Sequence, residues 1–133
     1  SACLVGSEMC IRDSIYERYT RPELEAQSKF LDYPLYHFDG MEQIRHLDTL
    51  LSIEELGMIQ WTSVVGQPSP LTFMDQLKKI QEKGKGLVLL LKPEEIEPAM
   101  QQLSSRGLFI LAEAESREEA DEIVRVVEKN TRE

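Results

Sequence analysis

A histidine and an aspartate two residues apart are the first candidates for chemistry in this chain. His37 and Asp39 lie in the stretch 32–40 (DYPLYHFDG), which predicts a strand that turns at Gly40. Because side chains alternate along a strand, His37 and Asp39 would share one face and Phe38 would point to the other. An imidazole beside a carboxylate can transfer protons or bind a metal. In parallel α/β folds such groups gather at the C-terminal ends of the strands.

Two glutamates near the end of the last predicted strand are candidate partners for this pair. Glu113 and Glu115 follow the apolar stretch 107–112. With His37 and Asp39, either carboxylate would complete a set of nitrogen and oxygen ligands for zinc or a harder divalent ion. The simpler interpretation is that Asp39 caps the following helix and His37 is a hydrogen-bonded core residue. The sequence leaves both interpretations open.

Gln60 and Trp61 end the second predicted strand at the level of His37. One of them could line a substrate pocket while the other packs beneath a helix. For Trp61 we favour packing in the core.

Hydrophobic periodicity predicts the elements that position these residues. Strands are expected at 32–40, 58–62, 87–91 and 107–112, and helices at 22–30, 41–51, 72–83, from Pro93 towards Gly107, and after Ser116 to about 129. The continuous apolar run 87–91 favours a strand buried on both faces. Four strands, each followed by a helix, indicate consecutive βα units with right-handed crossovers. Two α/β architectures fit this pattern, a small open parallel sheet and half of a (β/α)8 barrel, whose full length is typically about 250 residues.

Composition narrows the class of protein. The 133 residues are 41% hydrophobic, which indicates one domain with its own core. The 15 Lys and Arg against 24 Asp and Glu give a net charge of −9, and without a basic cluster nucleic acid is not an expected partner. No apolar run approaches the roughly 20 residues of a membrane helix, and no signal peptide is recognisable. We therefore expect no membrane partner and a cytoplasmic location.

The first fourteen residues differ in character from the rest. Residues 4–14 (LVGSEMCIRDS) resemble one reading frame of the adapter used in transposase-based sequencing libraries. We interpret 1–14 as a non-native segment and 15–133 as a domain truncated at its N-terminus. Both cysteines, Cys3 and Cys10, fall in this segment, so the remaining chain offers no disulfide, thiolate ligand or cysteine nucleophile.

Several motifs along the chain resemble one protein family. They are YxRPxL at 19–24, LDYPLYHFDG at 31–40, RHLDTLL at 45–51, GMIQW at 57–61, MDQLKKIQEKGK at 74–85 and GLFI at 107–110. Together they are similar to the C-terminal half of the uroporphyrinogen decarboxylase superfamily, and within it to the methyltransferase-like branch, whose members are labelled as corrinoid or trimethylamine-related proteins. The resemblance implies that the chain holds roughly the last four units of a (β/α)8 TIM-type barrel.

The resemblance also implies a site. Methyl-transferring members of the superfamily carry a His-x-Cys-Gly motif and a later cysteine, which bind a zinc ion that activates a thiol acceptor. The matching motif here is His37-Phe38-Asp39-Gly40, with aspartate in place of the cysteine, and the later position falls within 113–115, which also lacks cysteine. Carboxylates in place of thiolates predict weaker binding of zinc and better competition by manganese or magnesium.

These observations predict a fragment of a methyltransferase-type enzyme that acts at the C-terminal strand ends. His37 would be a ligand or acid–base group and Asp39 a ligand or orienting partner, with a small-molecule substrate and a corrinoid protein as candidate partner. The alternatives are a uroporphyrinogen decarboxylase-type lyase of porphyrin biosynthesis and a non-catalytic open-sheet binding or regulatory domain. We expect the fragment alone to be inactive and to self-associate, because a half barrel has two unpaired sheet edges.

Overall fold

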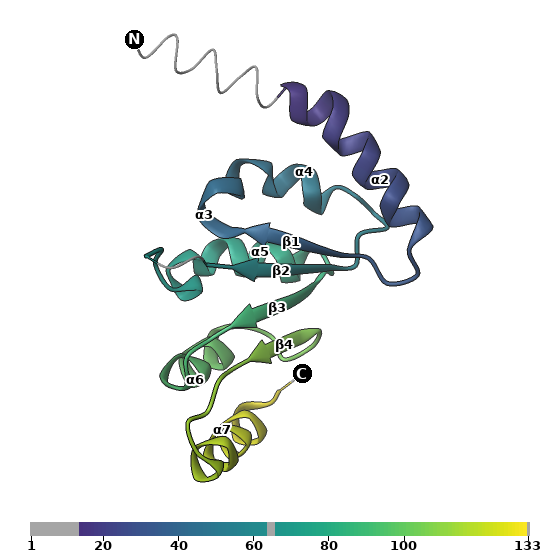
Figure 1. Cartoon of the computed structure of the whole chain (residues 1–133). Helices are drawn as coiled ribbons and strands as arrows, with labels where there is room; N and C mark the ends of the chain where they lie inside the picture. Colours follow the sequence, from purple (N-terminus) through teal and green to yellow (C-terminus); the bar gives the residue numbers. More distant parts are fainter. Residues whose placement is uncertain (1–13, 64–65, 133) are drawn as a thin grey trace.

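The four predicted strands form one parallel sheet in a computed structural model that describes residues 14–63 and 66–132 (Figure 1). The segment 1–14, interpreted above as non-native, lies outside the described residues except for Ser14. The strands pair in sequence order and are β1 (Leu35–Asp39), β2 (Met58–Thr62), β3 (Gly86–Leu90) and β4 (Leu108–Leu111). Each strand is followed by a helical segment, so the predicted α/β fold of four consecutive βα units is confirmed.

One of the predicted helices is broken into shorter segments. The segment 41–51, predicted as one helix, is divided into α3 (Gly40–Gln43), the 3₁₀ turn η2 (Ile44–His46) and α4 (Leu47–Leu51). Gln43 leaves the helical backbone conformation at φ −105° and ψ 3°. Its side-chain oxygen accepts a hydrogen bond from the Asp39 N–H at 3.3 Å, which links the end of α3 to the last residue of β1.

The remaining helical segments overlap the predicted helices, but helical backbone begins at 16 where 22 was predicted, and the helix predicted from Pro93 towards Gly107 ends at Gln102. They are the π-helical turn η1 (Tyr16–Thr20), α2 (Arg21–Phe30), the 3₁₀ turn η3 (Pro70–Phe73), α5 (Met74–Glu82), α6 (Pro93–Gln102) and α7 (Arg117–Asn130). None of the described helices is long and apolar enough to cross a membrane.

One face of the sheet carries the hydrophobic core. Alternate strand residues point to this face and pack against apolar side chains of α4, α5 and α6. The sheet contributes Tyr36, Phe38, Ile59, Trp61, Leu87, Leu89, Leu91, Leu108, Ile110 and Ala112. The helices therefore cover one side of the sheet, where they screen its buried residues from water (Figure 1).

The opposite face of the sheet contributes nothing to this core within the described residues. His37, Leu90, Phe109 and Leu111 lie on it and are exposed. The prediction that the run 87–91 is buried on both faces is therefore wrong at Leu90, which is 53% exposed because none of the described helices covers that side. Doubly wound sheets carry helices on both faces, whereas a barrel has helices outside and strands in sequence order. The arrangement matches half of a (β/α)8 barrel more closely than a doubly wound sheet.

Candidate functional site

His37 lies at the C-terminal end of β1, between polar groups of two neighbouring strands. Its Nε2 is 3.6 Å from Asp39 Oδ1 on the same strand. Its Nδ1 is 3.5 Å from Gln60 Oε1 and 3.5 Å from Thr62 Oγ1 on β2. The parallel register pairs His37 with Gln60 and Asp39 with Thr62, which places all four side chains on the open face.

Alternation along β1 explains why these groups face outwards. Phe38 is fully buried beneath the helices, so the residues on either side of it must point to the other face. The side chains of His37 and Asp39 are 60% and 50% exposed. Asp39 is the N-cap residue of α3 but its side chain makes no capping hydrogen bond. The interpretation of Asp39 as a cap and His37 as a core residue is therefore wrong.

Gln60 and Trp61 point to opposite faces of β2. Gln60 contacts His37, whereas Trp61 is 1% exposed and packs against Phe38 and Phe73 at ring-centroid distances of 4.9 and 5.5 Å. Trp61 thus packs beneath the helices, as favoured from the sequence, and does not line the polar cluster. Sequence reasoning missed Thr62, although its position two residues after Gln60 places it on the same face of a strand.

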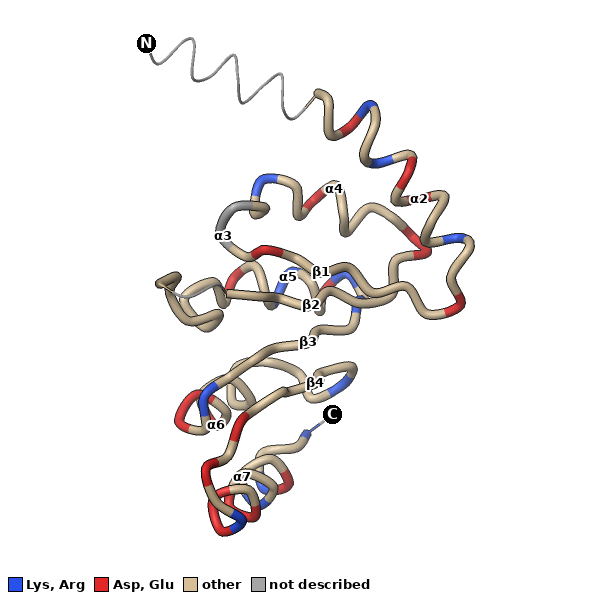
Figure 2. The backbone as a smooth tube through the Cα atoms, in the orientation of Figure 1, with Lys and Arg blue, Asp and Glu red and all other residues tan. Residues whose placement is uncertain are grey.

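The two glutamates predicted as partners lie elsewhere. Glu113 and Glu115 follow β4, and β2 and β3 separate that strand from β1. They line a separate cavity of about 800 Å³ at the C-terminal strand ends. The cavity is also lined by the segments 66–70 and 90–95, and Figure 2 shows acidic residues continuing from the end of β4 into α7.

The described side chains near His37 supply two of the ligands that a catalytic zinc site would need, His37 and Asp39. Such a site needs three protein ligands, and among the side chains that the structure describes, which leave out Glu42, no three of histidine, cysteine, aspartate or glutamate come together in this way. Only His37 and Asp39 of the predicted set approach each other. A metal bound by His37, Asp39, Glu113 and Glu115 stays a prediction.

The arrangement around His37 suits proton transfer. An imidazolium donates from both nitrogens, and Asp39 and Gln60 each offer an acceptor oxygen. In the neutral ring one nitrogen becomes an acceptor, and the Thr62 hydroxyl can donate to Nδ1. Both protonation states therefore find partners. Contacts of 3.5–3.6 Å are long, as is common in catalytic sites before substrate binds.

The groups with shifted pKa values, Tyr16, Glu17, Arg21 and Lys85, all lie outside this cluster. Burial lowers the pKa of Lys85, whose ammonium donates to the Ile53 carbonyl at 2.6 Å and so joins two loops. Burial, followed by the neighbouring Tyr36, raises the pKa of Tyr16, whose ring stacks on His46 at 3.8 Å. Both groups make contacts between segments away from His37.

No protein-family model, curated protein or solved structure matches the chain. The family resemblance of the motifs is therefore a hypothesis. The fold and the geometry around His37 are observed independently of it.

Proposed function

We propose that the chain forms half of a (β/α)8 enzyme of the uroporphyrinogen decarboxylase superfamily, in its methyltransferase-like branch. The supporting observation is the imidazole of His37 held between Asp39 on one side and Gln60 and Thr62 on the other. In a closed barrel the C-terminal ends of the strands form the mouth of the active site. His37 would serve there as the general acid–base group.

The chemistry that fits best is methyl transfer to an acceptor with an acidic proton, such as a thiol. The His37 ring would accept the S–H proton, and the thiolate sulfur would attack the methyl carbon while the leaving group keeps its electron pair. Asp39 would orient the ring and stabilise the imidazolium that forms. This route assigns to His37 the thiol activation that cysteine-bound zinc supplies in the methyl-transferring members.

The test uses the complete gene product, recovered by extending the coding sequence upstream of Ile15. Methyl transfer from a methylated corrinoid to a small thiol is followed by the change in the corrinoid spectrum. His37→Ala should lower kcat by about 10²–10⁴-fold, the usual contribution of a general acid–base group. His46→Phe is the matched control, because it replaces the second histidine yet preserves the stacking against Tyr16.

Three outcomes would contradict the proposal. The first is full activity in His37→Ala. The second is activity that requires added zinc and disappears with a chelator. The third is an upstream sequence without four further βα units, which would favour a non-catalytic open-sheet domain. Release of carbon dioxide from uroporphyrinogen by the same protein would instead assign the decarboxylase reaction.

A further inference from the structure

The partners of His37 differ in the hydrogen bonds that they can make. Its Nε2 lies 3.6 Å from Asp39 Oδ1, and its Nδ1 lies 3.5 Å from both Gln60 Oε1 and Thr62 Oγ1. An ionised carboxylate only accepts hydrogen bonds, whereas a hydroxyl can accept or donate and an amide can turn either its oxygen or its NH₂ group towards the ring. The carboxylate therefore suits only a ring nitrogen that carries a proton.

This difference decides where the neutral ring of His37 carries its single proton. A proton on Nε2 donates to Asp39, and Nδ1 then accepts from the Thr62 hydroxyl. A proton on Nδ1 would donate to Gln60 or Thr62 but leave the lone pair of Nε2 facing the carboxylate. Hydrogen bonds to ionised groups are about twice as strong as those between neutral groups. The arrangement therefore favours the proton on Nε2 and leaves Nδ1 as the basic nitrogen.

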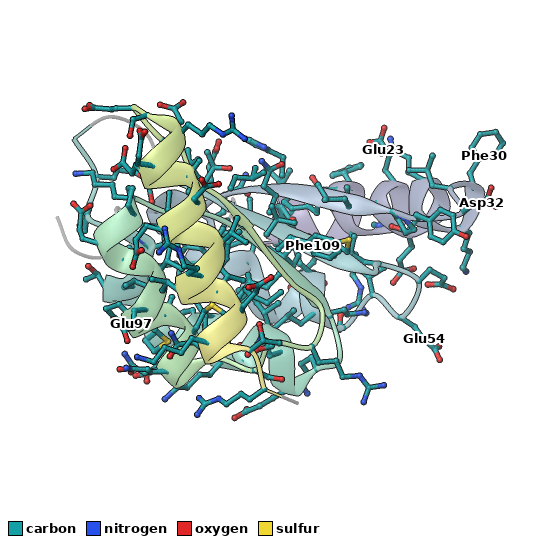
Figure 3. The ribbon with its side chains drawn as sticks, turned by 90° about the horizontal axis from the view of Figure 1, so that it is seen from below. Glu23, Phe30, Asp32, Glu54, Glu97 and Phe109 are labelled. Carbon is teal, nitrogen blue, oxygen red and sulfur yellow. The ribbon has the colours of Figure 1, made fainter. Side chains whose placement is uncertain are left out.

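Thr62 lies on the side of Nδ1 that is nearer to the strand ends. The register places His37, Gln60 and Phe109 at one level of the open face, where Figure 3 labels Phe109. Thr62 pairs with Asp39, two residues further towards the C-terminal ends. In a closed barrel these ends form the mouth of the active site. A substrate in the mouth therefore meets the Thr62 hydroxyl beside Nδ1.

We propose that Thr62 is a catalytic residue that passes a proton from the substrate to Nδ1 of His37. This inference rests on the proposed methyl transfer to a thiol. The S–H bond breaks as its proton goes to Thr62 Oγ1, while the proton of the hydroxyl moves from Oγ1 to Nδ1. Oγ1 exchanges one proton for another and stays neutral. The products are a thiolate, whose electron pair attacks the methyl carbon, and an imidazolium, whose Nε2–H donates to Asp39.

NMR of the purified chain tests the position of the proton. Both ring nitrogens of histidine are isotopically labelled, and spectra are recorded with a chelator at alkaline pH, where histidine is neutral. His46→Phe removes the signals of the second histidine and keeps an aromatic ring against Tyr16. We expect the proton on Nε2 in most molecules. Asp39→Asn should reduce the excess of this form about fivefold, because the charged acceptor is replaced by a neutral one.

Two results of this experiment would overturn the proposal. The first is a neutral His37 ring that is protonated mainly on Nδ1, because Nδ1 then has no lone pair to accept the proton from Thr62. The second is a ratio of the two forms that Asp39→Asn leaves unchanged, because the carboxylate would then not set the position of the proton.

Methyl transfer by the full-length protein tests the relay. Thr62→Val removes the hydroxyl and keeps the branched shape that suits a strand. It should lower kcat about tenfold, below the usual range of about 10²–10⁴-fold for a general acid–base group, because the thiol can still reach Nδ1 directly. Thr62→Ser is the matched control, because it keeps the hydroxyl and should restore most of the rate.

The solvent deuterium isotope effect on a single turnover distinguishes a relay from a change in packing. Two protons move in the relay and one moves in direct transfer to Nδ1. The isotope effect should therefore be smaller in Thr62→Val than in the wild type. Equal isotope effects, or equal losses of activity in Thr62→Val and Thr62→Ser, would overturn the relay.

The same experiments separate this inference from the proposed function. An inactive His37→Ala together with a fully active Thr62→Val would leave the proposed function intact and show that the relay is wrong. A wild-type protein that transfers no methyl group would contradict the proposed function itself, and the relay with it.

Discussion

At the scale of single residues, the polar cluster depends on how closely β1 and β2 approach at their C-terminal ends. Gly40 follows Asp39 and is buried against the end of β2. A Cβ atom at this position would lie 3.0 Å from the Thr62 carbonyl oxygen and 3.0 Å from Trp61 Nε1. The absence of a side chain at Gly40 thus allows Thr62 to sit opposite Asp39 and within reach of His37.

Gly40→Ala should therefore destabilise the protein by about 1–3 kcal/mol, the usual cost of overpacking. Urea denaturation followed by the fluorescence of Trp61, the single tryptophan, measures the change. Gly57→Ala is the control, because a Cβ there would meet only the Pro34 carbonyl oxygen at an ordinary 3.5 Å. Equal stability of the two variants would show that the end of β2 can move away at little cost.

At the scale of elements, α7 differs from the helices that carry the core. It has no buried residue, although Ile123, Val126 and Val127 pack partly against the core. A hollow of about 280 Å³ lies between α6, β4 and α7. The position of α7 therefore depends less on packing, and its N-terminal cap should contribute a larger share of its local stability.

Ser116 provides that cap, since its Oγ accepts a hydrogen bond from the Glu119 N–H at 3.1 Å. Ser116→Ala should lower the free energy of unfolding by about 1 kcal/mol, because it leaves a helix N–H without its partner. Ser116→Asp keeps an acceptor oxygen and should stay close to the wild type. Chemical denaturation of the three proteins at one concentration compares them. An alanine variant as stable as the aspartate variant would show that water replaces the cap at no cost.

At the scale of the whole molecule, the fold is expected to be independent of the first fourteen residues. A chain that begins at Ile15 should unfold within about 2 °C of the full sequence, a shift that corresponds to less than about 1 kcal/mol. The reason is that 1–14 has neither helical nor strand periodicity. Thermal unfolding at matched protein concentration is the measurement, because self-association, which is expected from the sequence, would make the midpoint depend on concentration. A clearly lower midpoint for the shorter chain would contradict the interpretation of 1–14 as non-native.

The sequence by itself determined the elements and which side chains share a face. Periodicity is a local property, so β2 matches its predicted bounds and the first helix ends at its predicted residue, although helical backbone begins with η1 at Tyr16 where 22 was predicted. Alternation likewise predicted that His37 and Asp39 lie together, as they do. The cap interpretation of Asp39 failed because the carboxylate turns towards His37 and makes no capping hydrogen bond, a choice that local pattern does not decide.

Only the tertiary structure decided the order of the strands and the side that the helices cover. These properties depend on pairing between residues far apart in sequence, which no local pattern encodes. Strand order brought Thr62 to His37 and placed Glu113 at the opposite edge of the sheet. One-sided coverage left Leu90 exposed, although its apolar neighbours in the same run are buried. The sequence around Leu90 does not predict its exposure, because burial depends on what packs against a residue and not on its type.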